Sequence, residues 1–178
     1  MLDIDALAAL AGKCGFTHCA PLNVTTLEFL PEIRDMCSAD KCRNYGKTWS
    51  CPPACPSLDD IRRRAGKYGG GLLVQTVGDL EDSYDWDGIQ ETEARHKANF
   101  KQLRSELEKE FDDLLALGSG PCNICKKCSY PDEPCRHPGK IEVSMEASGL
   151  FVSKVCTDNR LGYNYGPDKI SFTACFLF

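Results

Sequence analysis

The spacing of apolar and polar residues predicts helices and strands that alternate along the chain. Apolar residues three or four positions apart indicate helices over 2–13, 26–36 and 144–155. Short apolar runs indicate strands over 16–24, 72–77 and 172–178. This alternation is typical of an α/β or α+β fold, so we expect a single domain, residues 1–178, built on a small sheet.

Three segments carry more specific helix signals. Ser57 followed by Asp60 resembles a capping box, which satisfies free amides in a first helical turn, and predicts a helix that runs to about Lys67. Pro31 suits a first turn, so the helix over 26–36 is expected to start near residue 30. An apolar stripe over 88–117, with a spacing of mostly three or four residues, predicts one long amphipathic helix.

The composition is that of a globular protein except for its cysteine content. Hydrophobic residues make up 42% of the 178 residues and charged residues 26%, which excludes wholesale disorder. A chain of this length buries enough surface to fold without disulfides. Cysteine nevertheless occurs 12 times, so the thiols need an explanation other than the stabilisation of a small fold.

The charge distribution and the lengths of the apolar stretches limit the expected compartment and the expected partners. The net charge is −5 and the basic run 62–64 is short, so we expect no nucleic-acid partner. The first five residues carry acid where a secretory signal carries base, and no apolar stretch approaches the roughly 18 residues of a membrane helix. We therefore expect a cytoplasmic protein without membrane insertion. In a reducing cytosol, closely spaced cysteines indicate metal binding or redox chemistry.

The strongest chemical signal is the loop over 122–135. Cys122, Cys125 and Cys128 are each separated by two residues, and Cys135 follows after six more. Bacterial ferredoxins hold a 4Fe-4S cluster with the same three-cysteine core, although their fourth cysteine follows sooner and precedes a proline. We interpret the longer gap as a sign that Cys135 completes the same cluster locally. Structural zinc and redox disulfides are the alternatives.

A second group of four cysteines lies in the loop over 37–55. Its members are Cys37, Cys42, Cys51 and Cys55. The loop has too few apolar side chains to offset its own ordering entropy without something bound, and its prolines stiffen the segment that presents the last two thiols. We expect a second 4Fe-4S cluster here. Zinc, or a centre that uses fewer than four of these thiols, is the alternative.

The other four cysteines have weaker signals. Cys14, Cys156 and Cys175 are expected to be core residues, because free cysteine is among the most buried residue types. Cys19 lies on a predicted strand, and core packing and ligation remain equally open for it. His96 falls on the apolar stripe of the long helix, so we expect a buried structural histidine rather than a ligand.

These motifs resemble a family of predicted metal-binding, iron-sulfur proteins found mostly in anaerobic bacteria and archaea. The resemblance covers nearly the whole chain. It rests on the 122–135 loop, Cys37 and Cys42 before Tyr45, the segment 49–53 and the segment 144–149. It implies iron-sulfur binding in the cytoplasm of an anaerobe and leaves the reaction open.

The arrangement favours a small iron-sulfur protein with one or two 4Fe-4S clusters. It has two local sets of four thiols and no recognisable acid-base motif beside them, so single-electron transfer to a redox partner protein is the leading hypothesis. The partner would be a ferredoxin, a flavoprotein or a metalloenzyme. One alternative is an enzyme whose cluster keeps an iron open to substrate for desulfuration, dehydration or reduction. A zinc-stabilised interaction module is a further alternative.

Overall fold

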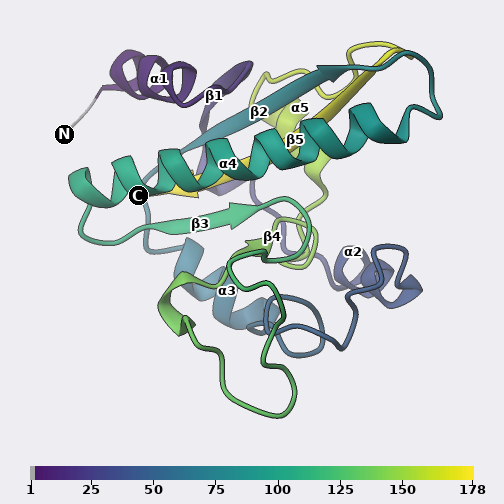
Figure 1. Ribbon diagram of the computed structural model, residues 1–178. Coiled ribbons are helices and arrows are strands. Elements are labelled where there is room, and N and C mark those ends of the chain that lie inside the picture. Colours follow the sequence, from purple (N-terminus) through teal and green to yellow (C-terminus); the bar gives the residue numbers. More distant parts are fainter. Residues whose placement is uncertain (1–2) are drawn as a thin grey trace.

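The computed structural model describes residues 3–178 and shows a mixed five-stranded sheet covered by helices on both faces (Figure 1). The strand order is β1-β2-β5-β3-β4. The strands are β1 (His18–Leu22), β2 (Gly71–Asp79), β3 (Leu115–Gly118), β4 (Val143–Ser144) and β5 (Lys169–Leu177). Neighbouring strands are antiparallel except for β3 and β4, which are parallel. The predicted mixed fold on a small sheet is therefore confirmed.

Helices cover both faces of the sheet, although one of them, the short helix over 31–35, has no buried residue. They are α1 (Ile4–Lys13), α2 (Pro31–Asp35), α3 (Leu58–Ala65), α4 (Trp86–Glu110) and α5 (Val152–Asp158). In β2, Leu72 and Val74 pack with residues of α1 and α4, whereas Leu73 packs with residues of α3 and α5. This alternation follows from the two-residue period of a strand, because both faces of the central strands are buried.

The long amphipathic helix is confirmed, but its predicted end at residue 117 was wrong. The helix ends at Glu110, and Phe111 has extended backbone and stacks on Phe178 with ring centroids 4.2 Å apart. Residues 115–118 instead form β3, which pairs with β5 and β4. The apolar residues after 110 are therefore held by pairing with a distant strand, which helical spacing could not reveal.

The predicted helix over 144–155 was wrong in its first half. Residues 145–149 form a tight turn directly after β4, and α5 begins only at Val152. The Ser144 hydroxyl accepts a hydrogen bond from the Ala147 amide, which competes with helical pairing. Gly149 has a φ of 78°, and a Cβ there would lie 2.8 Å from the carbonyl oxygen of Leu30. Glycine is required because neither this backbone conformation nor this close approach suits a side chain.

The other predicted elements are present with shifted bounds. Ser57 caps α3 and accepts the amide of Asp60, which confirms the capping-box signal. The expected helix over 26–36 is helical only from Pro31, and 24–26 form a separate 3-10 turn. The helix predicted over 2–13 is confirmed from Ile4 to Lys13, and Leu2 lies outside the described residues. Within residues 3–178, no helix has both the length and the apolar character needed to cross a membrane.

Candidate metal centres

The parallel pair β3–β4 brings the two cysteine loops together. A parallel pair cannot be joined by a tight turn, so the chain crosses over between the strands, and residues 119–142 form this crossover. The carboxyl ends of both strands meet at one edge of the sheet, beside the loop over 37–55 (Figure 1). Two cavities lined by cysteine lie in this region.

One of these cavities, which we call the second cavity, is lined by all four cysteines of the loop over 122–135. Its volume is about 160 Å³, and its lining includes Cys122, Cys125, Cys128 and Cys135. Burial raises the pKa of Cys122, and backbone amides oppose that shift. The structure thus brings together the four residues whose spacing predicted one centre.

Contacts with other parts of the chain hold this loop in place. The Trp49 indole nitrogen donates a hydrogen bond to the Glu133 carbonyl oxygen at 3.1 Å, and its ring meets Tyr130 edge-on with centroids 4.9 Å apart. Within the loop, the Arg136 guanidinium donates to the Lys127 carbonyl oxygen at 3.0 Å. The loop is therefore folded against the rest of the protein rather than extended into solvent.

The other cavity, which we call the first cavity, is lined by only three of the four cysteines of the loop over 37–55. Cys37, Cys42 and Cys51 line a space of about 310 Å³, together with residues that follow β3 and β4. Burial raises the pKa of Cys37, and the neighbouring charges of Glu146, Cys42 and Cys51 raise it further, whereas Arg34 lowers it. Cys42 and Cys51 therefore lie close enough to act on Cys37.

Cys55 has a different environment from the other cysteines of its loop. It is buried, as Cys51 is, but of these four cysteines it is the one that belongs to the apolar core under the sheet. The Arg34 guanidinium donates a hydrogen bond to Cys55 Sγ at 3.0 Å and others to the carbonyl oxygens of Cys55 and Pro56. Burial raises the pKa of Cys55 to about 11, although Arg34 opposes the shift. Cys55 is close to Cys37 and Cys51 but does not line the cavity.

Glu146 is a lining residue of the first cavity that the sequence did not single out as a ligand. It lies two residues after the end of β4, and it lines the cavity together with the three thiols. It is exposed to solvent, yet the protein around it raises the pKa of its carboxyl group by desolvation. The only available signal was its place in the segment 144–149, whose role could not be judged without the fold.

The two cavities share a wall made of two dipeptides. Ser50 and Cys122 line the second cavity, whereas their chain neighbours Cys51 and Pro121 line the first. The Cys122 amide donates a hydrogen bond to Ser50 Oγ at 3.1 Å, and this oxygen lies 3.8 Å from Cys51 Sγ. Ser50 is 2% exposed. One buried hydroxyl therefore links a residue of each cysteine group.

The donor set suits a metal that prefers sulfur. Within residues 3–178, all twelve cysteines are free thiols, and thiolates favour iron-sulfur clusters, zinc and copper(I) over hard cations. In the same residues, no three His, Cys, Asp or Glu side chains are disposed to hold a single ion. The chemistry of the two cysteine groups thus suits a metal that prefers sulfur, although their side chains are not already arranged around a single ion.

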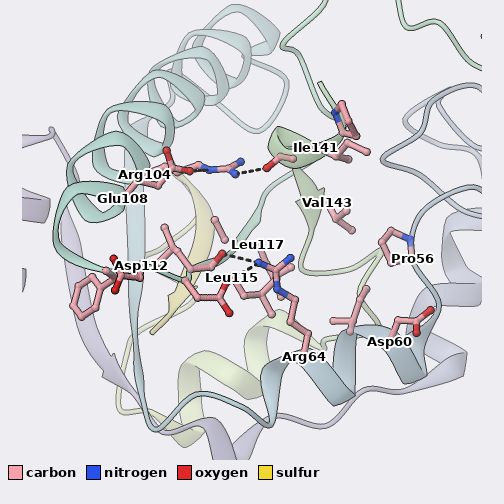
Figure 2. Close-up of a pocket in the computed structure, with 17 residues that line it drawn as sticks. Pro56, Asp60, Arg64, Arg104, Glu108, Asp112, Leu115, Leu117, Ile141 and Val143 are labelled. Carbon is pink, nitrogen blue, oxygen red and sulfur yellow. Dashed lines mark hydrogen bonds and ion pairs between the residues drawn. The ribbon is translucent and has the colours of Figure 1, made fainter. Parts of the chain in front are cut away.

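A larger cavity, of about 510 Å³, lies between α3, α4 and β3 and has a different character (Figure 2). None of the described cysteines lines it. Its two arginines are already engaged: Arg64 donates to the Leu114 carbonyl oxygen at 3.0 Å, and Arg104 donates to the carbonyl oxygens of Gly139 and Lys140. These contacts tie the residue before β3 to α3, and the segment after the second cysteine loop to α4.

The residues expected in the core are found there. Cys14, Cys156 and Cys175 are buried, as predicted, and Cys19 is partly buried against the core between the sheet and α4. His96 is 1% exposed and its Nδ1 lies 3.0 Å from Thr76 Oγ1, which confirms its structural place.

Comparison with known families agrees with the chemistry of these loops. A family model described as "Predicted metal-binding protein (DUF2284)" matches residues 20–178, a span that contains both cysteine groups. The chain belongs to this family. Neither a curated protein nor a solved structure matches it. Membership supports metal binding, and it specifies neither iron-sulfur chemistry nor an anaerobic source.

Proposed function

We propose that this protein holds an iron-sulfur centre in each of the two cysteine-lined cavities and transfers single electrons to or from a redox partner protein. A bound iron-sulfur cluster supplies a reversible one-electron change at a potential that its surroundings tune. The protein would supply the thiolates, the hydrogen bonds to them and the partial exclusion of water.

The four thiols of the second cavity support the iron-sulfur part of the proposal. Three of them follow the ferredoxin spacing, and all four line one small cavity. The crossover that carries them is anchored by Trp49 and Arg104, so contacts with the rest of the protein help to hold the loop in a defined shape. Preorganisation lowers the entropy cost of binding, because less of the chain must be ordered when the centre forms.

The shared wall is the observation that carries the electron-transfer part. Cys51 Sγ of one group and the Cys122 amide of the other contact the same Ser50 hydroxyl. Two centres in these cavities would be neighbours, so an electron that enters at one could pass to the other within the protein. A single isolated metal site would not need this arrangement.

Charge near the second cavity suggests where a partner binds. Lys126 lines this cavity and Lys127 follows it in the exposed part of the loop, in a chain with a net charge of −5. Opposite charge steers the encounter of redox proteins. We therefore propose an acidic surface on a ferredoxin, a flavoprotein or a metalloenzyme as the complement to this loop.

The test is metal, sulfide and redox analysis of protein purified without oxygen. We expect iron and acid-labile sulfide in similar amounts and reversible one-electron steps in a potentiometric titration followed by electron paramagnetic resonance. Cys125→Ser should remove one centre, whereas Cys19→Ser, a matched change outside both cavities, should remove none. Zinc without sulfide would contradict the proposal and favour a zinc-stabilised module. Iron that cannot be reduced in any accessible range would contradict electron transfer.

A further inference from the structure

We infer that the metal centre of the first cavity is held by three thiolates and one carboxylate, from Cys37, Cys42, Cys51 and Glu146, and that Cys55 is not a ligand. The inference rests on the proposed function only in requiring that this cavity binds a metal. It differs from the prediction that all four cysteines of the loop over 37–55 ligate.

The position of Cys55 is the first argument. Its sulfur accepts a hydrogen bond from Arg34 and lies 4.0 Å from the Ala147 carbonyl oxygen, inside the apolar core. Arg34 is itself fixed by two carbonyl oxygens at the end of the loop, with a distance of 2.7 Å to that of Pro56. Cys55 therefore has partners that explain its burial without a metal.

The position of Glu146 is the second argument. From residue 142 to residue 150, every residue is buried except Glu146, which lines the cavity. The turn that carries it is rigid, because Ser148 donates its hydroxyl to the Ser144 carbonyl oxygen at 2.8 Å and the Leu30 amide donates to Gly149 at 2.8 Å. The fold thus presents one carboxylate, at a defined place, to three thiols.

Charge is the third argument. Within residues 3–178, none of the ion pairs involves Glu146. Acidic donors that converge on one space repel each other when ionised, unless a cation lies between them. The Arg34 guanidinium is bonded to Cys55 and its neighbour and does not line the cavity. A bound metal would offset the remaining negative charge.

A mixed donor set has a chemical consequence. On a metal that prefers sulfur, a carboxylate oxygen is the weakest of the four donors. The first centre would therefore differ from the all-thiolate centre of the second cavity. The enzyme hypothesis expects a substrate to bind at an open position on a cluster iron, and Glu146 would occupy that position.

The experiment compares three variants of the full chain, purified without oxygen: Cys37→Ser, Cys55→Ser and Glu146→Gln. Iron and zinc are counted per chain, and the spectrum of the second centre serves as the internal control for folding. We expect Cys37→Ser and Glu146→Gln to lose most of the metal of the first centre, at least fivefold, and Cys55→Ser to keep it. Metal lost from Cys55→Ser with an unchanged melting temperature, or retained by Glu146→Gln, overturns the inference.

A direct measurement separates ligation from folding. The double variant Cys125→Ala/Cys128→Ala lacks two thiols of the second cavity, so X-ray absorption at its metal edge reports mainly the first centre. The spectrum should show one oxygen neighbour of the metal. This neighbour should disappear when Glu146→Cys is added to the double variant. An all-sulfur spectrum before that change overturns the inference while leaving electron transfer intact. Protein without iron or sulfide refutes the proposed function instead.

Discussion

Replacement of Ser50 by alanine tests the wall between the two cavities. Ser50 Oγ accepts the Cys122 amide at 3.1 Å and lies 3.1 Å from Thr48 Oγ1, and the residue is 2% exposed. Alanine keeps the backbone but leaves a partly buried amide without its partner. An unsatisfied buried donor costs about 1–3 kcal/mol, so we expect Ser50→Ala to lower the free energy of unfolding by about 1–2 kcal/mol.

The assay is urea unfolding of the metal-free protein, followed by chelator-induced metal loss from the loaded protein. We expect faster loss from Ser50→Ala, because the Cys122 backbone is no longer held against the first loop. Ser129→Ala is the matched control: its hydroxyl donates to the Pro134 carbonyl oxygen at 2.8 Å in an exposed part of the loop, so the expected change is below about 0.5 kcal/mol. Equal stability and equal metal retention in Ser50→Ala and the wild type would refute the reasoning.

Three further predictions concern the scaffold. The pKa of His96 is lowered to about 4 by burial, against about 6.5 in an unfolded chain, so the unfolded state binds the proton first as the pH falls. Urea unfolding of the metal-free protein should show about 3 kcal/mol of stability lost between pH 6.5 and 4, and a His96→Gln variant with the same slope would contradict this assignment. Gly149→Ala should destabilise the protein by about 1–3 kcal/mol in thermal unfolding, because its φ is 78° and its Cβ would meet Leu30; an unchanged melting temperature would show that the turn can relax. Arg34→Met should lower the free energy of unfolding by about 1–3 kcal/mol in urea unfolding, because its hydrogen bonds to Cys55 and Pro56 are lost, and Arg34→Lys is the milder control; equal stability of Arg34→Met and the wild type would contradict this role.

Local signals were sufficient for several parts of the structure. The capping box at Ser57 and the amphipathic stripe of α4 depend on neighbouring residues, and both are present in the structure. The end of α4, the strand β3 and the two-residue strand β4 depend on pairing partners far along the chain. Sequence spacing does not report such pairs, and the predicted helices over 88–117 and 144–155 were wrong where these contacts decide the backbone.

The sequence by itself determined which side chains can serve as metal ligands. The spacing of Cys122, Cys125 and Cys128 restricts these thiols to one loop, whatever the rest of the chain does. Only the tertiary structure decided which donors share a space. Cys55 is close in sequence to Cys51 yet lies in the core, whereas Glu146 is distant in sequence and lines the same cavity as Cys51. The physical reason is that cavity walls are made by strand ends and crossovers, whose positions depend on long-range packing rather than on local spacing.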